Sequence, residues 1–542
     1  ADVAVLARGF PFPIVPLSLA AQTVDLALSL AAQALTRCLA GEPPRAIDRA
    51  VWTIETTTLS TRRHALPMLP KNEDRDSAGA QPYPTPSALP PTPKQFTADG
   101  GHRTCTPEET LARLEDLISP ITGIIQGIQK LPTPPQIHAY AATQSWPSQL
   151  VRLQSNRVLG HPAGAGGKGQ TAVQAKVSCI AEAVERYSCG DHGDGKGVHG
   201  RLAGLAPEAI HPNDIMLFSA QQYLHRDTLN KGRESGASYN FVPKPFDPES
   251  PVRWTPVWSL THARPRLVPS ALCYFGYSRT RGKAEPDFAR TNSNGCAAGN
   301  TLTEAILQGL LELIERDACA LWWYSRARRP AIDLASFADP FIEQMQARYR
   351  DLGRALHVLD LRTDLRIPVA MAVSWREDDG GEIHMGLGCH LEPRMAVSRA
   401  LTELNQVAYS GLAAAARSQS NAVFDVDHLA WFRSETAETQ PYVRPLPDKV
   451  VRADALADHA SDDITQDIRY CVELLDRAGM ETLVLDHTRP DIRFPTARVL
   501  VPGLRHFWQR LAPGRLYDVP ASLGWVDAKL SEADLNPIPF FL

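Results

Sequence analysis

The sequence predicts a mixed α/β fold (α+β), in which one large domain follows a small N-terminal unit. Three observations support this fold class. Hydrophobic residues make up 44% of the 542 residues, as in ordinary globular proteins. Runs with strand character, at 253–259, 367–374 and 498–501, alternate with longer segments of helical periodicity. One proline-rich segment interrupts this pattern near the N-terminus.

The charge and cysteine content exclude several classes of protein. Lysine and arginine number 56 against 60 aspartates and glutamates, so the net charge is −4 and we expect no nucleic-acid partner. The most apolar stretch, 17–40, contains Asp25 and Arg37, which predicts an amphipathic helix and not a membrane span. No secretory signal is visible, and the nine cysteines form no CxxC pair. We therefore expect a cytoplasmic protein with free thiols and no membrane partner.

The proline-rich segment predicts the domain boundary. Six of the twelve residues from 82 to 93 are prolines, which end helices and cannot pair within a central strand. An extended linker is therefore expected. Upstream, the helix over 17–40 and a β-rich run over 51–59 form a unit too small to be stable alone, so we expect it to dock on another surface. The predicted division is a docking unit (1–75), a linker (76–104) and a large domain (105–542).

Two segments of the large domain lead into helices. Thr106 and Glu109 can form a capping box before an apolar helix, with Pro107 in its first turn. The glycine-rich segment 163–171 precedes a second helix, and its backbone N–H groups could cradle a phosphate. Because this segment lacks the GxxxxGK[ST] spacing of a P-loop, a flexible turn is the alternative interpretation.

Three predicted helices each carry polar residues along one face. They span 171–188, the residues that follow Asn300, and 394–408. In the first helix, Val177 and Ile180 belong to the opposite, buried stripe. The polar faces comprise Ser178, Glu182, Glu185 and Arg186 on the first helix, Asn300, Glu304, Gln308, Glu312 and Glu315 on the second, and Arg399, Glu403 and Gln406 on the third.

The second of these helices predicts a cation site. It contains four acidic residues and no lysine, so no i,i+4 partner offsets the repulsion on its acidic face. It ends in Leu321-Trp322-Trp323-Tyr324, which indicates burial on several sides, and buried carboxylates favour Mg²⁺. A solvated charged face is the alternative, and Glu304 could instead complete a capping box with Thr301. A di-iron site is not expected, because no histidine lies at i+3 from these glutamates.

These motifs resemble the YcaO family, in the family's order and spacing. The resemblance rests on Gly167-Lys168-Gly169, Ser178-x-x-x-Glu182-x-x-Glu185-Arg186, Ser293-Asn294-Gly295 through Glu304, Glu312 and Glu315-Arg316-Asp317, and Glu403-x-x-Gln406. More narrowly, Trp254-Thr255-Pro256, Gly514-Arg515-Leu516-Tyr517 and the proline-containing C-terminus resemble the azoline-forming cyclodehydratases, the D-proteins of thiazole/oxazole-modified peptide biosynthesis. The similarity covers 105–542.

The resemblance implies an ATP- and Mg²⁺-dependent cyclodehydratase that acts on a ribosomally synthesised precursor peptide, as in microcin and bacteriocin biosynthesis. A Cys, Ser or Thr side chain attacks the preceding backbone carbonyl, ATP phosphorylates the amide oxygen, and phosphate leaves to give a thiazoline or oxazoline. The residues agree with this chemistry, since phosphoryl transfer needs metal and positioning more than covalent help from the protein. Cys296 lies beside the motif and is expected to pack, with a catalytic thiol as the alternative.

The resemblance also implies roles for particular residues. The cofactor-binding residues implied are Lys168, Ser178, Glu182, Glu185, Arg186, Asn300, Glu304, Arg399, Glu403 and Gln406. The Mg²⁺ ligands implied are Glu182, Glu185, Glu304, Glu312 and Glu315. The catalytic centre implied includes Arg515, Pro537, Pro539 and Leu542. The apolar tail from residue 535 is expected to dock and to reach the substrate amide, with simple packing as the alternative.

The resemblance also predicts binding partners, and it leaves two alternative functions open. The docking unit resembles the end of a ubiquitin-activating-enzyme-like module, too short to bind a leader, so a separate leader-binding protein is expected beside the precursor peptide. An FMN-dependent azoline dehydrogenase and a second copy of the chain, in a homodimer, are also implied. Where such modules carry a zinc-binding cysteine pair, this chain has Lys71-Asn72-Glu73-Asp74, so no zinc is expected there. Thioamidation with an external nucleophile and a non-catalytic precursor-binding scaffold remain alternatives.

Overall fold

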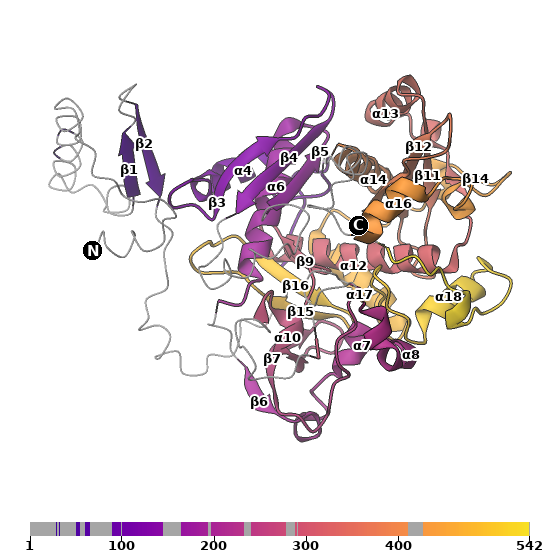
Figure 1. The fold of residues 1–542 in the computed structure, drawn as a ribbon. Helices are drawn as coiled ribbons and strands as arrows, with labels where there is room; N and C mark the ends of the chain where they lie inside the picture. The colour runs from indigo at the N-terminus through magenta and orange to yellow at the C-terminus, as the bar shows by residue number, and fades with distance from the viewer. Residues whose placement is uncertain are drawn as a thin grey trace.

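Helices and sheets are mixed along the whole chain, as Figure 1 shows. The computed structural model describes residues 29, 32, 50–54, 60–65, 89–98, 100–144, 164–192, 197–231, 240–277, 288–289, 291–409 and 426–540. Within these residues the strands form four sheets, which confirms the mixed fold class. None of the described helices combines the length and the apolar character needed to cross a membrane.

A five-stranded sheet carries two helices on one face and one on the other. Its strands run in the order β13 (His384–Cys389), β12 (Val369–Arg376), β11 (Arg354–Asp360), β10 (Ala331–Ile332) and β14 (Val450–Val451). The helices are α13 (Pro340–Asp351) and α14 (Pro393–Ala408) on one side and α12 (Leu302–Ser325) on the other. Successive side chains of β12 point to opposite faces, so Ala372 packs with α13 and α14 and Met371 packs with α12.

A second, antiparallel sheet covers α12 from the other side. Its strands run in the order β6 (Val198–Gly200), β7 (Val252–Ser259), β15 (Leu483–Asp486), β16 (Thr496–Leu500) and β9 (Cys296–Ala298), with β8 (Arg264–Pro269) also paired to β7. Val499 packs with α12, whereas Leu500 faces a separate cluster with α7 (Pro212–Met216) and α10 (Ser270–Cys273). Helix α12 therefore lies between two sheets, and 20 of its 24 residues are buried, as its sequence predicts.

The third sheet is formed by the N-terminal part of the large domain. It comprises β3 (Ile125–Lys130), β4 (His138–Gln144) and β5 (Gly164–Gly169), with α6 (Ala172–Ser188) packed across it and α4 (Pro107–Leu114) beside α6. The capping box predicted at the start of α4 is present between Thr106 and Glu109. The other described helices are η2 (Glu115–Leu117), η3 (Leu202–Leu205), α8 (Ala220–Leu224), α9 (Arg226–Leu229), η5 (Leu334–Phe337), α16 (Val426–Ser434), η6 (Pro441–Val443), η7 (Ala453–Ala455), α17 (Ile464–Arg477), α18 (Arg515–Ser522) and η8 (Glu532–Asp534).

The N-terminal unit is described in part. Strands β1 (Ala50–Ile54) and β2 (Thr61–Ala65) form an antiparallel pair, so the first half of the predicted β-rich run is confirmed. His64 Nδ1 lies 2.8 Å from Ser119 Oγ, which attaches this pair to the large domain. The predicted helix over 17–40 lies outside the described residues except for Ser29 and Ala32, which are helical.

Part of the predicted linker is packed structure. Residues 89–98 and 100–104 contact the large domain: Lys94 forms a buried ion pair with Asp467 at 2.6 Å, and Thr104 N donates to Glu304 Oε1 at 2.6 Å. The predicted boundary at 105 is based on proline content, which indicates only that regular secondary structure is absent. Proline content does not report whether an irregular segment is held by tertiary contacts.

The glycine-rich segment forms strand β5, and the expectation of a flexible turn is therefore wrong. A Cβ atom on Gly167 would lie 2.2 Å from Ala175 O of α6, and one on Gly166 would lie 2.2 Å from Gln406 Nε2 of α14. The glycines allow two helices to approach the strand closely. Local composition alone resembles a turn, and only the tertiary packing shows why the glycines are needed.

Helix α14 depends on a similar close approach to β13. A Cβ atom on Gly388 would lie 2.1 Å from Ala396 O and 2.5 Å from Ala400 N. We expect Gly388→Ala to push α14 from the sheet and to lower the free energy of unfolding by about 1–3 kcal/mol, measured by urea denaturation. The matched control is Gly127→Ala, whose Cβ would meet no atom within 4 Å and which should change stability by less than about 0.5 kcal/mol. Equal effects of the two substitutions would contradict the prediction.

Candidate functional site

One large cavity lies where α6, α12 and α14 converge on β5 and on the chain between 96 and 105. Its volume is about 560 Å³, which is in the range of small-molecule sites. All residues predicted to bind the cofactor or the metal line it, namely Lys168, Ser178, Glu182, Glu185, Arg186, Asn300, Glu304, Glu312, Glu315, Arg399, Glu403 and Gln406. The fold thus brings into one cavity groups that the sequence distributes over three helices and a strand.

Strand β5 and helix α6 form one wall of the cavity. Thr171 caps α6 with its side chain, so the helix begins directly after the strand. Glu182 Oε2 accepts a hydrogen bond from Gly166 N at 3.0 Å, and its Oε1 accepts one from Arg186 Nε at 3.0 Å. One oxygen of this carboxylate is therefore fixed to the backbone of β5 and the other to a cation.

Glu304 is held deep in the cavity by backbone and hydroxyl donors. Its side chain is 3% exposed, and Oε2 accepts a hydrogen bond from Asn300 N at 2.8 Å. Oε1 accepts bonds from the backbone and the hydroxyl of Thr104. Thr301 caps α12 as predicted, but the Glu304 carboxylate bonds Asn300 N and not Thr301 N, so the position of Glu304 is set by the cavity more than by the cap.

Three glutamates of the cavity resist ionisation: Glu315 is buried, and Glu185 and Glu312 are half-buried. Burial raises the pKa values of Glu185, Glu312 and Glu315, and nearby carboxylates raise them further. For Glu315 the pKa is raised to about 7. Arg316 Nη2 lies 3.3 Å from Glu312 Oε1, so the helix does contain an i,i+4 partner, and the expectation from its lack of lysine is wrong. Arg316 also lies 3.6 Å from Glu315 Oε1, and it lowers both pKa values without offsetting the burial. A carboxylate cluster of this kind fits a hard divalent cation such as Mg²⁺.

Helix α14 supplies polar groups that bridge the other walls. Glu403 forms an ion pair with Lys168 of β5; burial raises the pKa of Glu403, but Lys168 and Arg316 outweigh it and the net shift is downward. Arg399 Nη2 donates to Gln308 Oε1 at 2.6 Å. Burial lowers the pKa of Arg399 to about 10, so its guanidinium still carries a charge at neutral pH.

Two arginines on the cavity wall are absent from the predicted cofactor-binding set. Arg316 lies beside Glu312 and Glu315, and it could have been found because it directly follows Glu315 in the sequence. Arg103 lies on the segment predicted as a linker, so no sequence signal placed it near the helices. Both add positive charge where the phosphates of a nucleotide could bind.

The chain that carries Arg103 is tied to the body on both sides of it. His102 Nε2 lies 2.9 Å from Glu392 Oε2, next to the buried ring of His390. Burial raises the pKa of Glu392, but hydrogen bonds from His102 and the charge of Arg394 outweigh it, and the net shift is downward. The segment therefore forms a fixed part of the wall.

Arg515 does not line the cavity, which corrects its predicted place at the catalytic centre. Its guanidinium pairs with Asp317 at 2.7 Å and with Asp364 at 2.8 Å. Asp317 lies on α12 and is fully buried, so the ion pair neutralises a charge that would otherwise be costly inside the domain. Arg515 thus stabilises α12, which supports the cavity, and is not part of the cavity wall itself.

The C-terminal tail docks on α12, as its apolar sequence predicts. Trp323 Nε1 donates to Ile538 O at 2.7 Å. The buried ring of Phe540 lies 4.9 Å from the Trp323 ring and 5.1 Å from the Phe507 ring, measured between centroids. Because Phe507 lines the cavity, Phe540 of the tail lies beside the cavity wall.

The remaining tail residues differ in their surroundings. Pro537 is exposed and Pro539 is buried, and neither lines the cavity. Leu542, the fourth residue predicted at the catalytic centre, lies outside the described residues. The tail is therefore close to the cavity, but its described prolines do not form part of the wall.

Comparison with known sequences shows relatives over most of the large domain. A family model described as "YcaO cyclodehydratase, ATP- and Mg²⁺-binding" matches residues 166–505. An uncharacterized protein encoded in the tfuA 3′ region of Rhizobium leguminosarum bv. trifolii is 33% identical over 352 residues, which are 62% of this chain and 76% of that protein. An uncharacterized protein of Methanothermobacter thermautotrophicus is 26% identical over 349 residues, 63% of this chain and 81% of that protein.

Solved structures are similar over nearly the whole chain. A heterocyclase in complex with substrate and cofactor is 40% identical, with a TM-score of 0.82, and the match covers 92% of this chain and 65% of that one. The heterocyclase TruD is 33% identical, with a TM-score of 0.73, and the match covers 100% of this chain and 69% of that one. YcaO from Methanopyrus kandleri, at 21% identity and a TM-score of 0.54, shares the fold. The match of the family model over more than half of the residues, together with the cavity that collects its acidic motifs, shows that this chain belongs to the YcaO cyclodehydratase family.

Proposed function

We propose that this chain is an ATP- and Mg²⁺-dependent cyclodehydratase that converts Cys, Ser or Thr residues of a ribosomally synthesised peptide to azolines. The observation that carries the proposal is the cavity in which buried glutamates and several cationic side chains meet. The identity of 40% to a heterocyclase that binds substrate and cofactor supports it. A structure with the same fold holds AMPPCP and Mg²⁺, which suits the acids and cations found here.

The acidic residues are the proposed Mg²⁺ ligands. Glu182, Glu185, Glu304, Glu312 and Glu315 offer carboxylate oxygens within one cavity. The raised pKa values of three of them indicate that the empty arrangement is electrostatically unfavourable, and divalent cations would relieve it. The fit to hard cations therefore rests on charge and burial, and not on the motif alone.

The polar and basic residues are the proposed nucleotide contacts. Lys168, Arg186 and Arg399 place positive charge in the cavity, and we add Arg316 and Arg103 to them. Guanidinium groups bind phosphate oxygens in a bidentate manner. The residues proposed to orient the nucleotide beside these cations are Ser178, Asn300, Glu403 and Gln406.

The chemistry follows from the poor leaving ability of an amide oxygen. When bound, ATP would supply the phosphoryl group that turns this oxygen into a phosphate leaving group, and Mg²⁺ would neutralise the charge that builds up during the transfer. The peptide's thiol or hydroxyl adds to the preceding carbonyl carbon, phosphate departs with the oxygen, and loss of the amide proton leaves a C=N bond. The chain itself holds the reactants in line, and Phe507 and Trp508 line the cavity and limit the access of water.

Partners are proposed from the organisation of the chain. The short unit over 1–75 would dock a separate leader-binding protein, which presents the precursor peptide. A homodimer and an FMN-dependent azoline dehydrogenase belong to the same proposal. The domain division into 1–75, 76–104 and 105–542 is kept, except that residues 89–104 work as part of the large domain because they carry Arg103 and Thr104 to the cavity.

Mass spectrometry of a precursor peptide incubated with the protein, ATP and Mg²⁺ tests the proposed function. Loss of one water per modified residue is the expected result. Replacement of oxygen by sulfur upon addition of sulfide would indicate thioamidation, and an unchanged peptide without ATP turnover would indicate a scaffold. A leader-binding partner is supplied in a parallel reaction, so that failure of delivery is distinguished from absence of chemistry.

Removal of one carboxylate should strongly reduce both ATP turnover and ring formation. Glu304→Gln keeps the size of the side chain but removes its charge, so we expect ATP turnover and ring formation to fall by about 100-fold or more. The matched control is Glu473→Gln on α17. The Glu473 side chain is 64% exposed and does not line the cavity. A Glu304→Gln protein with full turnover and a normal dependence on Mg²⁺ would remove Glu304 from the site.

The stability of the metal-free protein should depend on pH through Glu315. Its pKa is about 7 in the folded state against an ordinary value of 4.5, so the folded protein binds this proton more tightly than the unfolded chain. Stability in EDTA should therefore fall as the pH rises from about 4.5 to about 7. We expect Glu315→Gln to reduce this loss and Mg²⁺ with nucleotide to reverse it, measured as Tm at each pH. Parallel curves for the two proteins would contradict the prediction.

Truncation after Phe540 tests the role of the terminus. Deletion of all residues from 537 would also remove Phe540 from the core, so the shorter truncation is the cleaner variant. Because Phe540 packs on Phe507 at the cavity, we expect the loss of the last two residues to reduce ring formation by about 10-fold or more. Tm and nucleotide affinity should not change. Cyclisation at the normal rate would show that the terminus only packs.

A further inference from the structure

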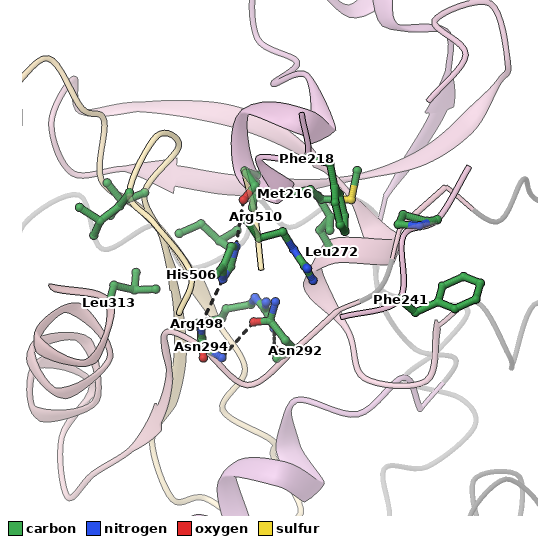
Figure 2. Close-up of a pocket in the computed structure, with 15 residues that line it drawn as sticks. Met216, Phe218, Phe241, Leu272, Asn292, Asn294, Leu313, Arg498, His506 and Arg510 are labelled. Carbon is green, nitrogen blue, oxygen red and sulfur yellow. Dashed lines mark hydrogen bonds between the residues drawn. The ribbon is translucent and has the colours of Figure 1, made fainter. Parts of the chain in front are cut away.

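A second, small cavity adjoins the nucleotide cavity on the far side of β9 and β16. Its volume is about 30 Å³, and Asn294 lines both cavities. Figure 2 shows that the polar side chains of Arg498, Asn294, His506 and Arg510 gather at its centre, beside the apolar Met216, Phe218 and Leu272. A cavity of this size holds one or two water-sized groups.

Arg498 is a buried cation in this cavity that has no acidic partner. It is 2% exposed, and it forms no ion pair with any residue of the described ranges. Its Nη1 donates to Asn292 O at 2.8 Å, and its Nε has no hydrogen-bond partner. No carboxylate belongs to the described lining of the cavity. A buried charge without a counter-charge is strongly unfavourable, so a negative group is needed nearby.

The neighbouring side chains favour an anion over a cation or a neutral group. His506 Nε2 donates to Ile215 O at 2.9 Å, so its Nδ1 accepts from Asn294 Nδ2 at 3.0 Å. Burial lowers the pKa of His506 to about 3, and the ring is neutral. Burial lowers the pKa of Arg510 to about 10, so its guanidinium adds a second positive charge to the same lining.

Cys296 is the competing source of negative charge. Its Sγ lies 3.4 Å from Arg498 Nη1. Burial raises the pKa of this thiol, but a hydrogen bond from Cys189 and the charge of Arg498 outweigh it, so the net shift is downward. However, Cys296 lines the nucleotide cavity and does not line the small one. A thiolate at Cys296 would leave Arg498 Nε without a hydrogen-bond partner and the small cavity without a negative group.

We propose that one monatomic anion, chloride under ordinary conditions, binds in the small cavity between Arg498 and Asn294. The volume favours this class of ligand, because a space of about 30 Å³ holds one or two water-sized groups and a monatomic anion is of that size. The anion supplies the counter-charge that no carboxylate of the described lining supplies. Since Gly295 follows Asn294 and donates to Glu312 Oε2 at 3.2 Å, the anion also steadies the backbone that holds one proposed Mg²⁺ ligand.

The wild-type protein tests the proposal directly. It is prepared in sodium gluconate, and gluconate is then replaced stepwise by chloride or bromide at constant ionic strength. We expect Tm to rise by about 2 °C or more and to saturate with either halide. Crystals grown with bromide should show one anomalous peak between Arg498 and Asn294.

Three results would overturn the proposal. A flat Tm without a bromide peak means that water fills the cavity. A peak without any effect on Tm means binding at crystal concentration only. A flat Tm in the wild type combined with a halide-dependent Tm in Cys296→Ser identifies the thiolate as the counter-charge.

Substitutions of Arg498 separate charge from shape. Arg498→Met should abolish the halide dependence of Tm, whereas Arg498→Lys, which keeps the charge, should retain part of it. The matched control is Arg362→Gln, which breaks an ion pair with Asp360 away from the cavity and should retain the full dependence. If Arg498→Met does not fold, the wild-type titration and the bromide peak still decide the question. Halide dependence that survives in a folded Arg498→Met protein would contradict the assignment.

Discussion

Repulsion between buried carboxylates is the constraint on which the rest of the structure depends. Glu185, Glu312 and Glu315 all lie where burial raises their pKa values, and the nearby cations Arg186, Arg316 and Lys168 do not lower them to the usual range. A fold that places acids together in this way must be rigid, because any relaxation would separate them. The rigidity comes from α12, which is enclosed by two sheets, and from the glycines that bring α6 and α14 against β5 and β13.

Helix α12 connects the parts of the molecule that would otherwise be independent. Its first turns carry Glu304 into the cavity, and its last turn carries Trp323 to the C-terminal tail. Between them, Asp317 receives the ion pair from Arg515. A substitution at either end therefore acts on the same rigid element, and effects on activity and on stability are hard to separate there without a matched control.

The sequence was sufficient to predict which residues meet in the cavity, because their motifs resemble those of the YcaO family. Helical periodicity by itself identified only the polar faces of three helices, on which Arg186 and Arg316 pair with Glu182 and Glu312. The sequence was not sufficient where the outcome depended on tertiary contacts. The glycines around Lys168 have the composition of a turn, but they pair with β4 as a strand, and the close approach of Ala175 and Gln406 shows why glycine is needed there. The composition of residues 89–104 is typical of a linker. Only the ion pair between Lys94 and Asp467 shows that this segment packs on the large domain. Arg515 belongs to a recognisable motif, but neither it nor its partner Asp317 lines the cavity, which no spacing rule reveals.

The order of the segments along the chain has a consequence for biosynthesis. The cavity wall includes Phe494, Phe507 and Trp508 besides the three acidic helices, and α12 is covered by β16 and by the tail through Phe540, all of which follow the acidic helices in the sequence. A nascent chain that has already exposed all the acidic helices still lacks the layer that excludes water from them. A chain interrupted before β16 therefore lacks part of the cavity wall as well as the layer that packs on α12.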